Sequence, residues 1–180
     1  MATSEEDFRQ FVQLRYTDLL RLAYALTGSA HEAEDLVQSA LLKVMRRWRR
    51  VEDPMPYLRR SMINQRASVW RRFAAREVVT ATPPDRPVRD ATDAVDDRQA
   101  VRTALRGLPP RMRAAVALRY VADLSEAETA ATLGCSVGTV KSQTAKGLAR
   151  LRRALEPPPQ RDEQPAEETR TARVVAWRKS

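Results

Sequence analysis

Several residue types that build catalytic or covalent sites are nearly absent from this 180-residue chain. It contains one cysteine, Cys135, and one histidine, His31, which excludes an internal disulfide and a zinc site made of Cys and His ligands. No apolar run approaches the roughly 18 residues that a membrane span requires, and residues 1–7 are acidic rather than signal-like. We therefore expect a soluble, cytoplasmic protein without a metal or other cofactor.

Glycine is also scarce, with five residues, and β-branched residues rarely alternate with polar ones. Ala, Leu, Arg and Glu instead recur at helical spacing. The sequence predicts an all-α fold of two small helical domains joined by a flexible acidic linker, the second domain containing a helix-turn-helix. The expected bounds are 1–76 for the first domain, 77–94 for the linker, 95–156 for the second domain and 157–180 for a C-terminal tail.

The charge balance is the first indication of function, because 32 Lys and Arg residues stand against 23 Asp and Glu residues, a formal net charge of +9. Such a surface attracts polyanions. A ribosomal protein or a membrane-surface protein would share this net charge. The distribution of the charge along the chain must therefore decide between these classes.

Helical periodicity divides the first domain into three helices. The first runs over about residues 4–26 and the third over about 53–76. Between them, Ser29 followed by Glu32 has the spacing of a capping box that opens the second helix. The core face of that second helix is expected to consist of Ala33, Leu36, Val37, Ala40, Leu41, Val44 and Trp48.

A basic zone extends over residues 46–76 and holds ten arginines and only two acids. Four aromatic residues are interleaved with these arginines: Trp48, Tyr57, Trp70 and Phe73. Arginine beside exposed rings is typical of single-strand binding, because guanidinium groups contact phosphates while rings stack on unpaired bases. The alternative is a solvated face over core aromatics, which we favour for Trp48 and Tyr57 and leave open for Trp70 and Phe73.

The sharpest motif lies in residues 126–143, where Ala130, Gly134 and Val140 occupy the three positions that a helix-turn-helix constrains most. A small residue lets the helices approach, glycine supplies a left-handed turn, and the third residue packs the second helix against the first. An ordinary helical hairpin with a glycine cap shares these features. The outer face of the second helix favours DNA, because its side chains are short polar or cationic groups suited to a major groove: Thr139, Lys141, Ser142, Gln143, Ala145 and Lys146.

Caps delimit both helices of this motif. Ser125 with Glu128 makes a second capping box, Gly134 ends the first helix, and Ser136 caps the second. The inner face of the second helix is expected to carry Val137, Val140, Thr144, Leu148, Leu151 and Leu155.

A third candidate surface lies on the second helix of the first domain. Glu34, Asp35 and Gln38 share a face with Leu42 and Met45. On the residues alone this is the exposed face of an amphipathic helix, and a site for a partner protein is the alternative.

Together the motifs resemble one family, the extracytoplasmic-function sigma factors of bacterial RNA polymerase. Ala33-Glu34-Asp35-Leu36-Val37-Gln38 looks like the core-polymerase-binding helix of sigma factors, and the segments 108–113, 124–128 and 134–142 look like their fourth region. The resemblance covers roughly residues 8–155. The order and spacing of these motifs and the absence of a middle domain match this group. The residues within the motifs most resemble its actinobacterial SigE-like subfamily.

The resemblance implies a transcription initiation factor that performs no chemistry, binds core RNA polymerase and recognises and melts promoter DNA. An anti-sigma factor is a further candidate partner, and no membrane is implied. The residues that would meet the polymerase clamp are Asp35, Gln38, Leu42 and Met45. A second set would bind the non-template strand of the minus-ten element and hold a flipped base in a pocket: Asn64, Ala67, Ser68, Trp70 and Arg71. Those that would read the minus-thirty-five element are Thr139, Lys141, Ser142, Ala145 and Lys146.

Two other classes of protein share some of these features. A response regulator has a similar turn in its helix-turn-helix output domain, but it predicts an α/β receiver, and no strand-rich run with paired acids is present here. A small nuclease needs clustered carboxylates or histidine with a metal. The acids Asp90, Asp93, Asp96 and Asp97 instead lie in the expected linker.

Overall fold

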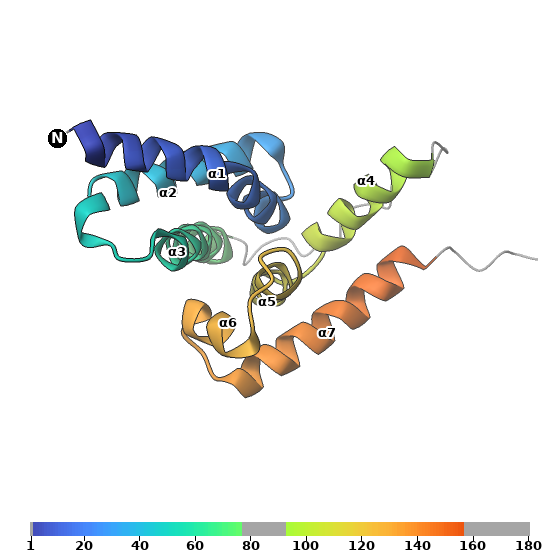
Figure 1. Cartoon of the computed structure of the whole chain (residues 1–180). Coiled ribbons are helices and arrows are strands. Elements are labelled where there is room, and N and C mark those ends of the chain that lie inside the picture. Colours follow the sequence, from blue (N-terminus) through green and yellow to red (C-terminus); the bar gives the residue numbers. More distant parts are fainter. Residues whose placement is uncertain (1, 77–92, 157–180) are drawn as a thin grey trace, which may run out of the picture.

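The computed structural model describes residues 2–76 and 93–156, with side chains described for 4–68 and 99–156 (Figure 1). Within these ranges the chain is helical and contains no strand, so the all-α prediction is confirmed. No helix in the described ranges is long and apolar enough to cross a membrane. The elements are α1 (Ala2–Thr27), α2 (Ala30–Met45), η1 (Trp48–Arg50), α3 (Pro54–Arg76), α4 (Asp93–Arg106), α5 (Pro110–Tyr120), α6 (Glu126–Leu133) and α7 (Val137–Leu155).

The turn between α1 and α2 is built by a glycine and a serine cap. Gly28 has φ 73°, a left-handed conformation that favours glycine, and the Ser29 side chain accepts a hydrogen bond from the backbone N–H of Glu32 at 3.5 Å. The other half of the expected capping box is wrong, because the Glu32 carboxylate accepts a hydrogen bond from Arg66 of α3 at 3.0 Å instead. A long-range ion pair has replaced a local cap.

The core face of α2 is close to the prediction, since Ala33, Leu36, Val37, Ala40 and Val44 are buried. The helix ends at Met45, however, before it reaches Trp48. Trp48 begins the short η1 helix, and its ring packs edge-on against Phe8 at 5.1 Å and tilted against Phe11 at 5.2 Å. Trp48 and Tyr57 both pack against the apolar core, as we favoured, whereas Trp70 and Phe73 lie outside the described side chains.

The helix-turn-helix is formed by α6 and α7. Ser125 and Glu128 make the expected capping box, and Gly134 adopts a left-handed conformation at φ 66°. Ala130 and Val140 are buried between the helices. One expectation is wrong: Val137 is 39% exposed, because it lies in the first turn of α7, whose inner face is buried only from Val140 onward.

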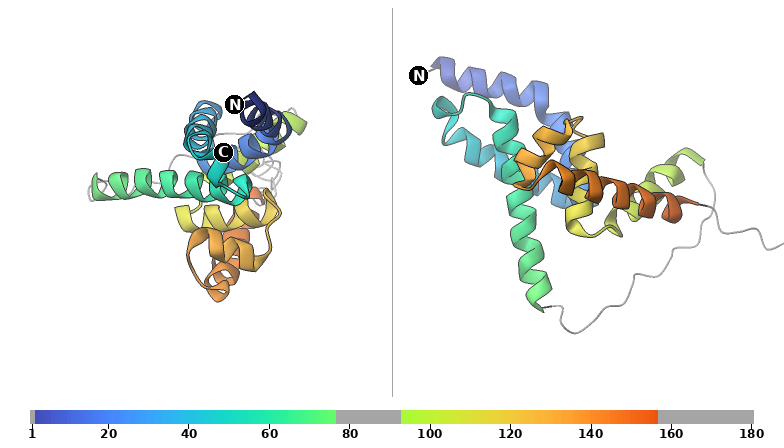
Figure 2. Two further views of the ribbon diagram at one scale, coloured as in Figure 1. Left: turned by 60° about the vertical axis from the view of Figure 1, so that its left-hand side comes forward. Right: turned by 90° about the horizontal axis from the view of Figure 1, so that it is seen from below.

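Helix α5 lies at the centre of the molecule (Figures 1 and 2). Six consecutive residues from Arg113 to Leu118 are buried, as expected for a helix that is covered on every side. Apolar residues of α1, α2, α3 and α5 belong to one continuous core cluster. The two halves of the chain therefore pack directly on each other. The expected tail and nearly all of the expected linker lie outside the described residues.

Candidate interfaces for a partner protein and nucleic acid

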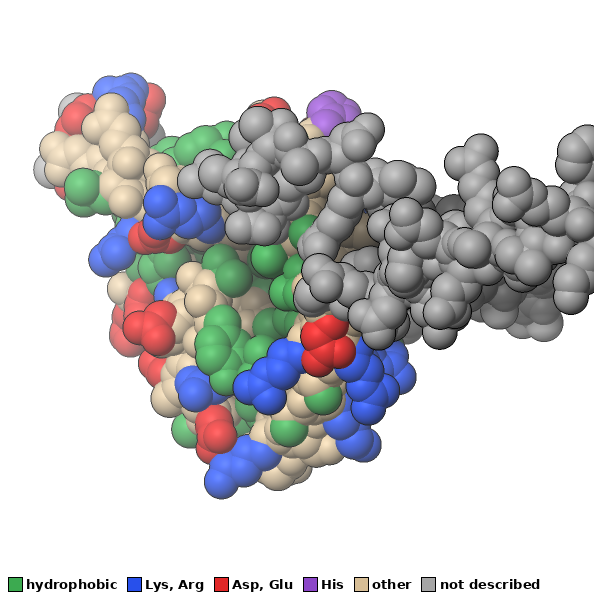
Figure 3. Space-filling model, turned by 90° about the vertical axis from the view of Figure 1, so that its right-hand side faces the viewer, with side chains coloured by type: hydrophobic (Ala, Val, Ile, Leu, Met, Phe, Trp, Pro, Cys, Tyr) green, Lys and Arg blue, Asp and Glu red, His purple; other side chains and the backbone are tan. Residues whose placement is uncertain are grey.

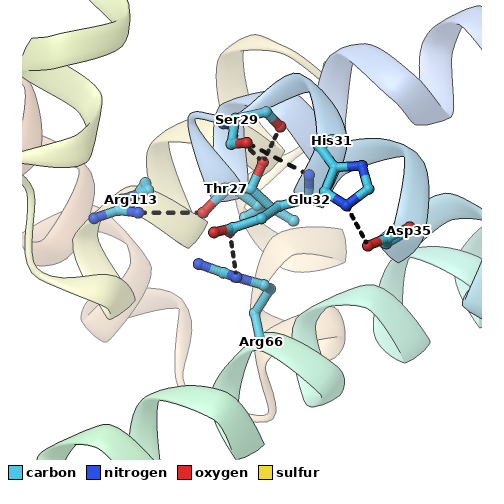
Figure 4. A network of polar contacts seen from close by, with 8 residues as sticks. Thr27, Ser29, His31, Glu32, Asp35, Arg66 and Arg113 are labelled. Atoms are coloured by element: carbon cyan, nitrogen blue, oxygen red, sulfur yellow. Dashed lines mark hydrogen bonds and ion pairs between the residues drawn. The ribbon is translucent and has the colours of Figure 1, made fainter.

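The exposed face of α2, defined by Asp35, Gln38, Leu42 and Met45, is the first candidate interface. All four side chains are exposed, and the apolar pair is unusual in being so: Leu42 is 53% and Met45 is 48% exposed. Asp35 lies 3.6 Å from His31 one turn earlier on the same helix (Figure 4). The structure thus brings together the four residues that the sequence assigned to a partner.

A hollow of about 270 Å³ opens beside this face. Gln38, Leu42 and Met45 line it from α2, together with Leu41, and α1 contributes Phe8 and Val12. The sequence analysis did not assign Phe8 and Val12 to this surface, and both side chains are half-buried. An apolar hollow beside exposed Leu and Met is a surface suited to a partner helix.

The α3 helix carries the second candidate interface. Asn64 is exposed, Ala67 and Ser68 are half-buried, and Trp70 and Arg71 lie in the helix beyond the described side chains. The first part of the helix is tied to α2 by the hydrogen bond from Lys43 to Gln65, at 3.2 Å, and by the Arg66–Glu32 pair. Figure 2 shows the C-terminal half of α3 extending away from the rest of the molecule.

Four arginines flank Trp48 at the turn before α3: Arg46, Arg47, Arg49 and Arg50. With Ser4, Met45 and Trp48 they line a hollow of about 340 Å³. No carboxylate of the described residues lies within 4.0 Å of any of these four guanidinium groups. The packing of Trp48 on Phe8 and Phe11 holds this arginine turn in place.

The outer face of α7 is the third candidate interface, and Figure 3 shows basic side chains gathered at the level of α7 in the lower part of the molecule. Lys141 lies 3.5 Å from Glu126 of α6. The Thr139 hydroxyl is 2.9 Å from that of Ser136, whose oxygen also accepts the backbone N–H of Thr139 at 3.1 Å. All five residues predicted to read DNA are exposed: Thr139, Lys141, Ser142, Ala145 and Lys146.

Positive charge continues along α7 beyond these residues. Arg150 and Arg153 are exposed and follow Lys146 at helical spacing on the same face, and Glu156 is the only acid in residues 136–156. The face can therefore contact phosphates along its length as well as base edges near its N-terminus.

The capping box at the start of α6 changes the pKa of one of its side chains, Glu128. The Ser125 backbone N–H donates to the Glu128 carboxylate at 2.7 Å, and the Glu128 N–H donates to the Ser125 hydroxyl at 3.2 Å. Interaction with the side chain and then the backbone of Ser125 lowers the pKa of Glu128, and Arg59 of α3 adds a smaller effect in the same direction. The described residues contain no group of three or more His, Cys, Asp or Glu that could hold a metal ion.

Two segments of the chain match known protein families. Sigma-70 region 2 matches residues 11–76, and Sigma-70, region 4 matches residues 98–151. The first match covers α1 to α3, and the second covers the helix-turn-helix. An α/β receiver therefore has no place before the helix-turn-helix, and the response-regulator alternative is not favoured.

Individual relatives agree with this division. The chain is 42% identical over 152 residues to the RNA polymerase sigma-E factor of Streptomyces coelicolor, covering 83% of this chain and 86% of that protein. It is 36% identical over 152 residues to the ECF RNA polymerase sigma factor SigM of Mycobacterium tuberculosis, covering 82% of this chain and 76% of that protein.

Two solved structures have a similar fold. The sigma factor RpoE of Bartonella quintana, in complex with the anti-sigma factor NepR, superposes with a TM-score of 0.66 at 26% identity and covers 83% of this chain and 97% of that one. CnrH, in complex with the cytosolic domain of CnrY, has a TM-score of 0.61 at 20% identity over 84% of this chain and 88% of that one. The second likeness concerns the fold alone.

Proposed function

This chain belongs to the extracytoplasmic-function sigma factors, and we propose which of its surfaces binds the polymerase and which surfaces bind promoter DNA. Members of this family bind core RNA polymerase and direct it to promoters, and the chain is a promoter-recognising sigma factor of the SigE-like type. The observation that carries the assignment is the presence of both sigma regions, in order, with a helix-turn-helix in the second. Residues 1–76 act as the polymerase-binding and minus-ten region, 77–94 as the linker, 95–156 as the minus-thirty-five region and 157–180 as a tail.

The exposed face of α2 binds core RNA polymerase. Leu42 and Met45 offer apolar contact beside the hollow lined by Phe8 and Val12, and Asp35 and Gln38 supply polar contacts on the same face. Burial of exposed apolar side chains against a partner helix gives affinity, and flanking charges give specificity.

The α3 helix from Asn64 onward binds the non-template strand of the minus-ten element. Asn64 offers an amide that can hydrogen-bond a base edge, Ala67 and Ser68 leave room beside it, and Trp70 and Arg71 follow on the helix. Extruding a base from the stack costs a few kcal/mol, and contacts to the flipped base offset that cost. The arginine turn around Trp48 adds positive charge near the beginning of α3.

The outer face of α7 reads the minus-thirty-five element. Its N-terminal residues Thr139, Lys141 and Ser142 are exposed, as are Ala145 and Lys146 in the next turn. A recognition helix contacts base edges with its N-terminal residues. The arginines farther along α7 suit phosphate contacts, which position the helix without reading sequence.

Three further features follow from the family. The chain itself carries out no chemistry, because in this family catalysis belongs to the polymerase. It works in the cytoplasm, where polymerase and promoter DNA meet. An anti-sigma factor is a regulatory partner, a proposal supported by the complex of the similar RpoE with its anti-sigma factor.

One experiment tests the function directly. Purified chain is added to core RNA polymerase, and run-off transcription is measured on promoter templates and on templates with scrambled elements. We expect transcripts that start at the promoter only when both proteins are present. Tight DNA binding by the chain alone, with no polymerase-dependent start, would overturn the proposal.

A further inference from the structure

The helix-turn-helix carries an ion pair between its two helices at the surface. Glu126 is the first residue of α6, and its carboxylate lies 3.5 Å from the ammonium group of Lys141 in α7. The Glu126 side chain is 39% exposed and the Lys141 side chain is 64% exposed. Figure 1 shows α6 beside the beginning of α7. Because Lys141 belongs to the face of α7 proposed to read DNA, the pair lies where DNA would approach.

The pair is not needed to hold the two helices together. Buried Ala130 and Val140 already pack α6 on α7. The capping box at the start of α6 is formed by Ser125 and Glu128, without Glu126. An ion pair between exposed side chains adds little to stability. The position of the pair favours a role in DNA binding instead.

The pair gives the two lysines of the reading face different surroundings. A carboxylate lies within 4.0 Å of the ammonium group of Lys141, whereas none of the described residues places one that close to Lys146. An acid at the start of α6 is unfavourable for DNA binding by itself, because the first helix of a helix-turn-helix crosses the phosphate backbone. Glu126 therefore neutralises one cation of the reading face and repels phosphates that come near it.

The geometry of the pair distinguishes a phosphate contact from a base contact. A lysine ammonium is a point charge on a flexible stem, so it can follow any phosphate within reach, and phosphate contacts raise affinity for every sequence alike. To reach a phosphate, Lys141 would have to leave Glu126 and bring the phosphate close to the carboxylate. The ammonium group has three donors, however, so it can keep Glu126 as one partner and donate to guanine O6 or N7 with another.

We propose that Glu126 is a positioning residue that determines specificity: it holds the Lys141 ammonium for base edges of the minus-thirty-five element and keeps it away from phosphates. The proposal rests on the proposed function of α7. Discrimination of this kind comes from weakening the binding of wrong sequences as well as from strengthening the right one. Glu126 supplies the repulsion, and Lys141 supplies the attraction.

The test compares Glu126→Gln with the unmodified full chain, each bound to core polymerase. Fluorescence anisotropy measures the affinity for a cognate duplex with the minus-thirty-five element and for a scrambled duplex over a series of salt concentrations. We expect Glu126→Gln to bind the scrambled duplex about fivefold more tightly, the size of one exposed ion pair, and the cognate duplex less than about twofold more tightly. For the scrambled duplex, the slope of log K against log salt concentration should steepen by about 0.9, as for one added phosphate contact.

Asp123→Asn is the matched control for net charge. It removes the same charge from the turn before α6, where Asp123 is exposed and has φ 51°, a conformation that asparagine also adopts. Since no cation of the described residues lies within 4.0 Å of the Asp123 carboxylate, this variant should leave the ratio of cognate to scrambled affinity unchanged. An equal fall in that ratio in both variants would overturn the proposal, because net charge alone would then be sufficient.

Lys141→Gln shows whether Glu126 acts through Lys141. In a Lys141→Gln background, Glu126→Gln should no longer change the ratio of cognate to scrambled affinity. A change of the same size in that background would overturn the proposal, since Glu126 would then act without Lys141. A purely structural role of Glu126 would not depend on Lys141 in this way.

The outcomes also separate this inference from the proposed function. If the unmodified holoenzyme prefers the cognate duplex and Glu126→Gln leaves that preference unchanged, the positioning role fails and the proposed function stands. If the unmodified holoenzyme shows no preference, the proposed reading of the minus-thirty-five element by α7 fails, and the positioning role with it.

Discussion

Arg113 and Leu26 are 87 residues apart in sequence, yet the guanidinium of one donates to the backbone carbonyl of the other at 3.2 Å. This contact joins the segment that matches Sigma-70 region 2 to the segment that matches Sigma-70, region 4 in a single packed body. The residues of α2 proposed to bind polymerase and those of α7 proposed to read DNA are exposed around it. The exposed surfaces can therefore be altered separately from the packing that supports them.

Charge reversal at Asp35 is expected to abolish binding to core polymerase while leaving the fold intact. Asp35 is exposed, and among the described residues the only basic side chain within 4.0 Å of its carboxylate is the His31 ring, at 3.6 Å. Asp35→Arg should change the free energy of unfolding by no more than about 0.5 kcal/mol. Surface plasmon resonance with core polymerase measures the first effect, and chemical denaturation measures the second.

The matched control is Asp18→Arg, which reverses an exposed acid on α1 with weak pairs to Arg15 and Arg21. It should bind polymerase as the unmodified chain does. Equal affinity of the Asp35→Arg variant and this control would remove Asp35 from the interface.

Truncation of Lys146 is expected to weaken recognition of the minus-thirty-five element. Lys146 is exposed on the outer face of α7, and loss of a base contact costs about 1 to 3 kcal/mol. Lys146→Ala should therefore lose affinity for the cognate element, but little for a scrambled one, in titrations of polymerase holoenzyme. A uniform loss on every sequence would make Lys146 a phosphate contact instead. Arg153→Ala, farther along the same face, is expected to give that uniform pattern.

A methyl group at Gly147 is expected to destabilise the packing of α7 on α5. A Cβ there would lie 2.7 Å from Cγ2 of Val116, which is buried. Overpacking of this kind costs about 1 to 3 kcal/mol, more than the roughly 1 kcal/mol that a helix gains when Gly is replaced by Ala. Gly147→Ala should lower the melting temperature measured by calorimetry.

Gly138→Ala is the control, because the nearest atom to a Cβ there is 3.9 Å away. It should be neutral or slightly stabilising. Adding Val116→Ala to Gly147→Ala should recover part of the loss through a favourable coupling. A strictly additive double variant would show that the clash is relieved elsewhere.

The Glu128 cap is expected to make stability depend on pH in the acid range. Because the pKa of Glu128 is lowered in the folded chain, its contribution is present above the unfolded value of about 4.3. That contribution is lost as pH falls through the folded value. The melting temperature of Glu128→Ala should be below that of the unmodified chain at pH 7, and the difference should shrink below about pH 4.

Glu34→Ala, which removes an exposed acid of α2, serves as the control for this measurement. It should not produce the same convergence in acid. A Glu128→Ala difference that is as large at pH 3 as at pH 7 would show that the carboxylate charge does not support the cap.

Local signals in the sequence were sufficient to place most helix ends. Ser125, Gly134 and Ser136 each act on backbone groups within five residues, so their roles can be read from spacing. The exposed residues of α2 and α7 were likewise identified from helical periodicity. Val137 was misassigned because periodicity does not reveal where the neighbouring helix stops covering α7.

Long-range packing could not be read in this way. Nothing in the segment around Arg113 distinguishes it from exposed Arg111, two residues earlier, because its burial depends on the end of α1. Glu32 was assigned to a local cap but pairs with Arg66, whose position is determined by the packing of α3 on α2. The place of Phe8 and Val12 beside the exposed face of α2 also depends on how α1 lies against α2.

The burial of α5 on every side has a consequence for how the chain is made. On a ribosome, α1 to α3 emerge before α5, and folding proceeds from the N-terminus during synthesis. When α5 appears, the residues of α1 to α3 that cover one side of it have already been synthesised, and the helices that follow cover the rest. A fragment that begins at α4 would have to fold without that surface. In the full chain, by contrast, α5 can pack on residues that were synthesised before it.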